Sequence, residues 1–230
     1  VDLIATNPTL STITAVQRTK KVPVFMMVSP RPDIAHLTDA QGNSPSNLFG
    51  TYETLDYIDT SLMLIKEVFP NAVTVGTIFN QSEPQSVDAL ARIEARCKTM
   101  GMRLEKFPVN NSNETQLVVA ALLEKKPDIF FALPDNTVFS SMELIVKSCD
   151  DKHVPVFTSE EGLVKRGALA AYGADMYQWG YQSGAQAAMY LKQGSAENLR
   201  PEPVKVRRKV CNPEKERQFG VRLDSTFVRS

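Results

Sequence analysis

Three apolar runs of this chain end abruptly in clusters of small polar and acidic residues, and this pattern limits the fold more than any other. The pairs of run and cluster are residues 74–79 with 80–84, 129–133 with 134–137, and 154–157 with 158–162. Each run has the composition of a β-strand, and each cluster leads into a segment of helical periodicity. In an open parallel α/β sheet, ligands bind in the crevice beyond the carboxyl ends of the strands. The sequence therefore predicts that the three clusters meet at one binding site.

Strand-like and helix-like segments alternate along almost the whole chain. The expected strands are residues 2–6, 22–28, 72–79, 102–108, 128–133, 154–158, 168–172 and 204–210. The expected helices are residues 8–19, with Pro8 near the first turn, 54–69, 84–100, 113–125, 137–150, 175–193 and 213–219. The strands are apolar throughout rather than alternating, which is typical of a parallel sheet covered by helices on both faces. We therefore expect an α/β fold of doubly wound parallel sheets.

Three breaks in composition interrupt this alternation. They lie at residues 30–50, at Gly173–Ala174 and at residues 193–203. They indicate that the chain passes between two lobes more than once. We expect an N-terminal lobe of residues 1–70 with 173–196 and a C-terminal lobe of residues 71–172 with 197–230.

Charge and hydropathy argue against two kinds of partner. The 26 basic residues balance the 26 acidic ones, so the net charge gives no electrostatic reason to expect binding to nucleic acid or to an anionic membrane surface. The most basic run, residues 205–209, alternates with valines and is typical of the solvated face of a strand. No stretch approaches the roughly 20 apolar residues that a membrane span needs. We expect no nucleic-acid partner.

The first residues and the cysteines say little about the compartment. The chain opens on Val1–Ala5, which reads as the middle of a fold rather than as a signal peptide. Cys97, Cys149 and Cys211 lack the spacing of metal ligands. Two of them fall in helical segments, where we expect small buried residues.

Several segments together resemble the tryptophan/tyrosine-type substrate-binding proteins of bacterial ABC transporters. The matching segments are residues 1–4 with Thr9, 22–24, 80–86, 134–138, 154–162, 164–170 and 175–180. Their order and spacing agree over nearly the whole chain, although each segment alone is a weak signal. Residues 29–37, after the second strand, match the family pattern imperfectly.

The resemblance implies a two-lobed type I periplasmic-binding-protein fold that holds a small amino-acid-like solute in the cleft between its lobes. It favours an aromatic or other apolar amino acid as the ligand and implies an ABC permease in the membrane as the partner. It also implies a periplasmic or other extracytoplasmic location, with lipid anchoring as an option. Family members have two βα units before the strand at residues 2–6, so the resemblance implies an incomplete N-terminal lobe here.

An amino-acid-like ligand carries an ammonium and a carboxylate, and each is costly to bury without a partner. For the ammonium we expect Asp135 with Glu160 or Glu161, because charge-assisted hydrogen bonds are strong. For the carboxylate we expect donors at helix N-termini. The candidate ligand-binding residues are Thr9, Asn80, Ser82, Glu83, Asp135, Asn136, Thr137, Ser159, Glu160 and Glu161. Aromatic residues that could contact an apolar ligand side chain are Phe49, Tyr52 and Tyr177, although a position in the core or on the lobe surface is the favoured explanation for all three.

The polar residues also have interpretations that need no ligand. Asp135 can serve as a helix N-cap, alone or together with ligand binding. Glu83 and Glu160 lie in expected first helical turns, where the helix dipole favours acids. Asn80 can form an Asx-turn.

Catalytic signatures are missing from the sequence. We find no Gly-x-Ser-x-Gly, Gly-x-Gly-x-x-Gly or Gly-x-x-x-x-Gly-Lys motif. The two histidines make no convincing metal set, and no cofactor is expected. We therefore expect a binding protein rather than an enzyme. Two alternatives stay open: an extracytoplasmic sensor domain of the same fold, and a sugar- or nucleobase-processing enzyme on a similar sheet.

Overall fold

The chain folds into two compact units, each built from separate stretches of sequence. The computed structural model describes residues 1–7 and 9–230, so the expected helix start at Pro8 lies outside the described residues. Unit 1 consists of residues 1–54 and 174–207, and unit 2 consists of residues 55–173 and 208–230. The polypeptide therefore passes from one unit to the other three times.

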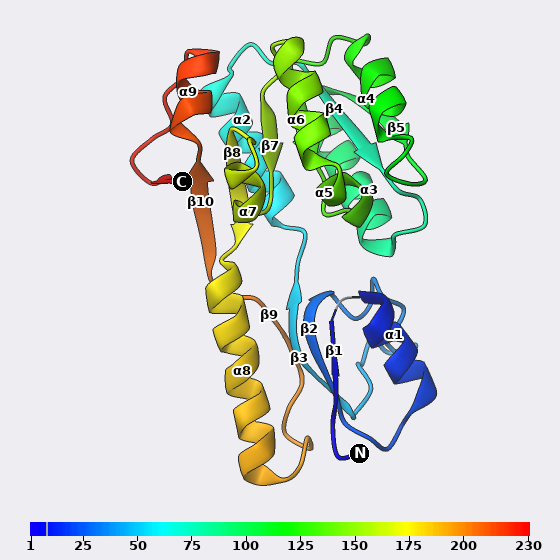
Figure 1. The fold of residues 1–230 in the computed structure, drawn as a ribbon. Coiled ribbons are helices and arrows are strands. Elements are labelled where there is room, and N and C mark those ends of the chain that lie inside the picture. Colours follow the sequence, from blue (N-terminus) through cyan, green and yellow to red (C-terminus); the bar gives the residue numbers. More distant parts are fainter. Residues whose placement is uncertain (8) are drawn as a thin grey trace. The chain divides into compact units, whose positions relative to one another are not determined.

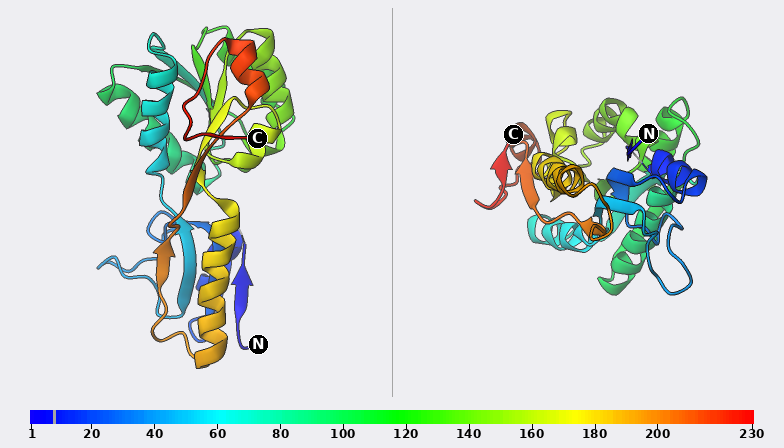
Figure 2. Two further views of the ribbon diagram at one scale, coloured as in Figure 1. Left: turned by 90° about the vertical axis from the view of Figure 1, so that its left-hand side faces the viewer. Right: turned by 90° about the horizontal axis from the view of Figure 1, so that it is seen from below.

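Unit 1 contains a four-stranded sheet in the order β1-β2-β3-β9, and its paired strands run parallel. Its elements are β1 (Ile4–Thr6), α1 (Thr9–Arg18), β2 (Val24–Pro30), β3 (Leu48–Glu53), α8 (Met176–Gln193) and β9 (Pro201–Pro203). Val16 of α1 packs with Val24 of β2, whereas Tyr190 of α8 packs with Phe25 of the same strand. Successive strand residues point to opposite faces. The two helices therefore cover opposite faces of this sheet, and α8 runs along β3 (Figure 2).

Hydrogen bonds fix α8 to β3. Trp179 Nε1 donates to Thr51 Oγ1 at 2.8 Å, and the Gly50 amide donates to Gln186 Oε1 at 2.8 Å. Gly50 has a φ of +122°, and a Cβ added there would lie 2.0 Å from the Met26 carbonyl oxygen. Only glycine therefore fits where β3 passes so close to β2.

Unit 2 contains a seven-stranded sheet in the order β11-β10-β8-β7-β6-β4-β5 (Figure 1). Its helices are α2 (Tyr57–Val68), α3 (Pro84–Thr99), α4 (Thr115–Leu123), α5 (Asn136–Ser140), α6 (Met142–Asp151), α7 (Glu161–Lys165) and α9 (Pro213–Phe219). Its strands are β4 (Thr74–Phe79), β5 (Arg103–Pro108), β6 (Ile129–Ala132), β7 (Val156–Thr158), β8 (Ala170–Ala174), β10 (Arg207–Cys211) and β11 (Val228–Arg229). The last residue of β8, Ala174, and the first residue of β10, Arg207, belong to unit 1.

Helices cover both faces of the unit 2 sheet. On one face, Phe130 of β6 packs with Val119 of α4 and Ile145 of α6. On the other face, Phe69 at the end of α2 meets Phe157 of β7 edge to face, with ring centroids 6.1 Å apart. The expected α/β fold with doubly wound parallel sheets is confirmed.

The strands β4 to β8 run parallel, but β10 reverses direction. The Asn212 amide, after β10, donates to the carbonyl oxygen of Leu169, before β8, at 2.9 Å. The Asp175 amide, after β8, donates to the carbonyl oxygen of Val206, before β10, at 3.0 Å. The end of each strand thus meets the start of the other, so β10 is antiparallel to β8.

The structure differs from the sequence expectations in several places. The expected helix over residues 137–150 is divided at Ser141 into α5 and α6, and the short strands β3, β9 and β11 were not expected. Residues 55–70 group with unit 2 because α2 packs on α3, and residues 197–207 group with unit 1 because β9 pairs with β3. None of the helices in the described part of the chain combines the length and hydropathy that a membrane crossing requires.

Candidate functional site

Three neighbouring strands of unit 2 bring the predicted polar clusters to one edge of the sheet. β6 pairs in parallel with both β4 and β7, so the carboxyl ends of all three strands lie side by side. Asn80, Asp135 and Ser159 each follow one of these ends within three residues. Because paired strands lie about 4.8 Å apart, the three clusters are adjacent.

Asp135 joins the ends of β4 and β6. Its side chain is 1% exposed. One carboxylate oxygen accepts hydrogen bonds from the Asn80 amide and the Ser86 hydroxyl, both at 2.6 Å, and the other accepts from the Val138 amide at 3.0 Å. Asp135 is therefore the N-cap of α5, as the alternative interpretation expected, and it also organises the loop after β4.

Glu83 lies beside the same helix N-terminus. Its carboxylate accepts hydrogen bonds from the backbone and side-chain amides of Asn136, both at 2.9 Å, and from the Thr137 amide at 3.4 Å. Burial raises the pKa of the Glu83 carboxyl, the negative charge of Asp135 raises it further, and the Asn136 and Thr137 hydrogen bonds lower it. Glu83 thus bridges the loops that follow β4 and β6.

Asn80 completes this connection. It is 7% exposed, and its Nδ2 atom donates to Thr137 Oγ1 at 2.9 Å. Its Oδ1 atom accepts from the Ser82 amide at 2.9 Å, which is the Asx-turn that the alternative interpretation expected. The structure therefore brings six of the predicted residues into one hydrogen-bonded group, the β4–β6 cluster. Its members are Asn80, Ser82, Glu83, Asp135, Asn136 and Thr137.

The β4–β6 cluster is anionic. Asp135 and Glu83 both carry carboxylates, and in the described part of the chain neither forms an ion pair with a lysine or an arginine. Their hydrogen-bond donors are neutral amides and two hydroxyls. Two acids without a basic partner at a strand end make a site that favours a cation.

The third strand end presents Ser159, Glu160 and Glu161, all half-buried. Glu160 caps α7 by accepting from the Gly162 amide at 3.0 Å. Glu161 is directed towards β10, where Arg208 Nη1 lies 3.1 Å from Glu161 Oε2. Glu161 is therefore neutralised, whereas Glu160 is not part of an ion pair among the described residues.

Two buried hydroxyl residues of this region were not predicted from the sequence. Ser86 donates to Asp135, and the Thr158 hydroxyl at the end of β7 has no hydrogen-bond partner among the described residues. A serine that interrupts the apolar stripe of α3 was the available signal for Ser86, because its neighbours on that face, Leu90 and Ile93, are core residues.

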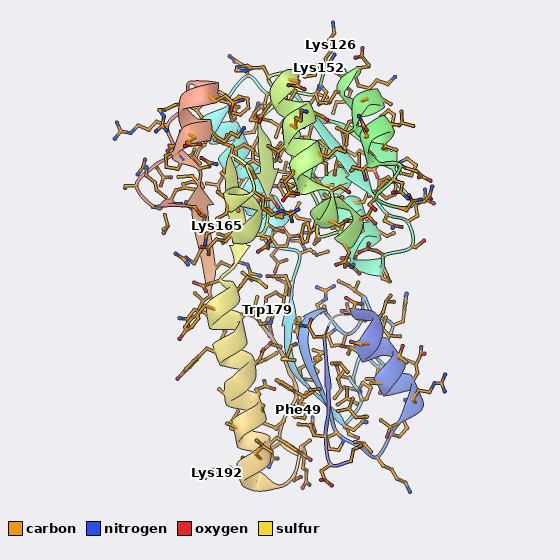
Figure 3. The ribbon with its side chains drawn as sticks, in the orientation of Figure 1. Phe49, Lys126, Lys152, Lys165, Trp179 and Lys192 are labelled. Atoms are coloured by element: carbon orange, nitrogen blue, oxygen red, sulfur yellow. The ribbon has the colours of Figure 1, made fainter. Side chains whose placement is uncertain are left out.

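Thr9 and the three aromatic candidates belong to unit 1. Thr9 is buried at the first position of α1. Phe49, labelled in Figure 3, is fully buried. Its ring stacks on Tyr190 with centroids 5.4 Å apart, which supports its core interpretation. Tyr52 is half-buried against the unit 1 core, and Tyr177 is 77% exposed. Any contact of these residues with the ligand stays a prediction.

The remaining reactive groups form no metal site in the described residues. No group of three histidine, cysteine, aspartate or glutamate side chains there could hold a metal ion. The cysteines are buried and free, and burial raises the pKa of Cys97 and Cys211 to about 11 and that of Cys149 to about 12. Neutral thiols in the core fit the small buried residues expected from the sequence.

Comparison with known proteins decides the family. Residues 1–229 match the family described as ABC transporter substrate binding protein. The chain belongs to this family. The family is one of binding proteins rather than enzymes, and its members act outside the cytoplasm.

Individual relatives agree with the family assignment. A tyrosine-binding protein of Clostridioides difficile (strain R20291) is 31% identical over 191 residues, which are 83% of this chain and 55% of the relative. The chain thus spans about half the length of that curated relative. A conserved domain protein of Vibrio cholerae has a solved structure that matches 99% of this chain and 78% of its own with a TM-score of 0.89 and 26% identity.

A further solved structure shows the fold alone. The ABC domain in complex with L-Trp from Streptococcus pneumoniae is 23% identical, with a TM-score of 0.86 over 99% of this chain and 80% of its own. Together these structures confirm the type I periplasmic-binding-protein fold.

Proposed function

We propose that this protein is the extracytoplasmic solute-binding protein of an ABC importer, and that it captures a small amino-acid-like solute by closing its two units around it. The observation that carries the proposal is the β4–β6 cluster, in which two carboxylates lie at a strand end without a basic partner. The ammonium of an amino acid is a cation of suitable size for such a site. Family membership supports a solute-binding role.

Within the cluster, Glu83 and Asp135 have different roles. Asp135 is 1% exposed, so we assign it to positioning the loop after β4 through the hydrogen bonds that it accepts. Glu83 is only half-buried and bridges two loops at the strand ends. We therefore assign the ligand ammonium to Glu83, with Glu160 as the second acid.

The ligand carboxylate needs N–H and hydroxyl donors. Ser82 offers an exposed hydroxyl, and Ser159 offers another at the end of β7. Thr9 lies at the N-terminus of α1 in unit 1, where the helix dipole favours an anion. In this proposal unit 2 binds the ammonium and unit 1 contributes to binding the carboxylate, so the ligand favours the closed state through its contacts with both units.

The favoured ligand is an aromatic amino acid. One relative is named a tyrosine-binding protein, and another was solved with L-Trp. Three passes of the chain between the units provide the hinge for closure. The closed, loaded protein would then dock on a membrane permease.

Calorimetric titration tests the proposal. L-tyrosine and L-tryptophan are titrated beside 3-(4-hydroxyphenyl)propionate, which lacks the ammonium, and tyramine, which lacks the carboxylate. We expect the amino acids to bind and both analogues to bind at least tenfold more weakly, since one charge-assisted hydrogen bond contributes about 1.5–3 kcal/mol. Small-angle scattering should show a smaller radius of gyration with the amino acid.

Variants locate the ammonium site. Glu83→Gln should weaken amino-acid binding by roughly tenfold to a hundredfold, and it should leave binding of the analogue without ammonium unchanged. Glu67→Gln is the control, because Glu67 is an exposed acid of α2 outside the cluster. The proposal fails if no amino acid binds or raises the thermal midpoint, and the Glu83 assignment fails if both variants bind equally.

A further inference from the structure

A small basic pocket lies at the end of α9, between this helix and the last residues of the chain. Its volume is about 360 Å³. Three arginines line it, Arg217 from α9, Arg222 from the following loop and Arg229 from β11. Glu216 is the acidic residue in its wall.

The arginines outnumber the acids that could neutralise them. Glu216 is 7% exposed, and one of its oxygens accepts from the Leu223 amide at 2.8 Å. Its other oxygen lies 3.5 Å from Arg229 Nε. Arg217 and Arg222 form no ion pair among the described residues, so the pocket holds an excess of positive charge.

The other arginines of unit 2 provide a comparison. Arg92, Arg166 and Arg208 each lie within about 3.1 Å of a carboxylate oxygen. Arg96 of α3, by contrast, forms no ion pair among the described residues, but it stands apart from any second unpaired arginine. Two arginines left unpaired in one pocket point to a partner that brings the negative charge.

The backbone holds the three arginines in place. α9 ends in a left-handed residue, Gly220, with a φ of +64°, and the Val221 amide donates back to the Glu216 carbonyl at 3.0 Å. On the other wall, Arg229 pairs with Cys211 of β10 in the β10–β11 register. The pocket is therefore built on a helix end and on a paired strand rather than on a loose tail.

The pocket is separate from the β4–β6 cluster. α9 comes directly after β10 in the chain. Because β10 runs antiparallel to β8, α9 lies at the edge of the sheet where the parallel strands begin. Phe219 at the end of α9 contacts His153, just before β7, with ring centroids 5.0 Å apart. The β4–β6 cluster lies at the opposite edge of the same sheet, so the two sites can be tested independently.

We propose that this pocket binds a phosphate group. A guanidinium presents a planar fork of N–H donors that matches phosphate oxygens in a bidentate manner and keeps its charge at every relevant pH. Three such groups around one pocket suit a compact anion with several acceptor oxygens. The phosphate can belong to a phospholipid headgroup or to a free phosphate compound, because both present the same oxygens.

Two binding measurements test the pocket and identify the source of the phosphate. Inorganic phosphate is titrated by calorimetry at low salt, and cosedimentation is measured with vesicles of phosphatidylcholine alone and with vesicles that also contain phosphatidylglycerol. The variant Arg217→Gln/Arg222→Gln removes both unpaired charges. The control Arg18→Gln/Lys147→Gln removes the same charge from exposed positions on α1 and α6.

We expect the wild type to bind phosphate or the phosphatidylglycerol vesicles, and the pocket variant to bind at least tenfold more weakly, while the control variant binds as the wild type does. Binding in the calorimetric titration identifies a free phosphate compound as the ligand, and binding to the phosphatidylglycerol vesicles identifies a phospholipid headgroup. Binding that is equal in both variants overturns the proposal, and so does absence of binding in both arms. Amino-acid binding at the β4–β6 cluster should be the same in all three proteins.

Discussion

Replacing Asp135 with asparagine isolates the contribution of one buried carboxylate to unit 2. Asparagine is itself a good N-cap, so its carbonyl oxygen can keep the bond to the Val138 amide. Its NH2 group, however, takes the place of the oxygen that accepts from the Asn80 amide and the Ser86 hydroxyl. The hydroxyl can rotate and become an acceptor, but a backbone N–H cannot. Asp135→Asn therefore leaves the Asn80 amide facing another donor.

The expected cost follows from that one unsatisfied donor. A buried donor without a partner costs about 1–3 kcal/mol, and the lost charge-assisted bond adds to it. We expect a loss of about 2–3 kcal/mol for Asp135→Asn, and more for Asp135→Ala, which also removes the helix cap at about 1 kcal/mol. Ser86→Ala alone should cost less, because the carboxylate keeps its two amide donors.

Hydrogen exchange measured by mass spectrometry reads this effect locally. Peptides that cover residues 80–86 and 135–141 should exchange roughly thirtyfold to a hundredfold faster in Asp135→Asn than in the wild type, as 1.4 kcal/mol corresponds to tenfold. Trp179 is the sole tryptophan and lies in unit 1, so its fluorescence provides an internal control that should not change. Unchanged exchange in both peptides would refute the view that Asp135 holds the two loops together.

Three further predictions concern other parts of the structure. The pKa of Glu83 is raised in the folded state, so folding favours its protonated form. Its ionisation therefore lowers the free energy of unfolding as the pH rises from below the ordinary glutamate pKa to above the raised folded-state pKa. The urea midpoint of Glu83→Gln minus that of the wild type should therefore increase over this pH range, and a constant difference would contradict the shift. Glu53→Gln removes the ion-pair partner of the partly buried Arg207 and should destabilise unit 1 by about 1–3 kcal/mol, measured by Trp179 fluorescence. Glu124→Gln, at an exposed ion pair with Lys152, should cost under about 1 kcal/mol of stability. Gly50→Ala should cost about 3 kcal/mol or more because its Cβ would meet the Met26 carbonyl, while Gly194→Ala, which has open space around it, should cost about 1–2 kcal/mol; equal thermal midpoints would show that β3 can shift.

The sequence predicted the polar edge of unit 2 well because its signals are local. Each of the strands β4, β6 and β7 is a continuous apolar run, and each polar cluster follows directly in the chain. Parallel pairing then brings these ends together by geometry alone. The caps formed by Asp135 and Glu160 were also readable, because an N-cap depends on neighbours within three residues.

Features that depend on distant residues were not readable. β3 falls at the end of a stretch rich in proline, asparagine and serine, and it forms a strand because Gly50 lets it approach β2. The Asp135 carboxylate accepts a hydrogen bond from Ser86, 49 positions away in the sequence. Composition therefore gave no reason to distinguish the positioning role of Asp135 from the ligand-binding role proposed for Glu83.

The three crossings of the chain between the units determine how either unit can be produced separately. No continuous stretch of sequence encodes either unit, because residues 174–207 of unit 1 interrupt unit 2. Simple truncation would yield a damaged half, and producing unit 2 by itself would require splicing residue 173 to residue 208. A protease that cuts one connection would leave two others intact, so a nicked molecule should still migrate as a single particle until it is denatured.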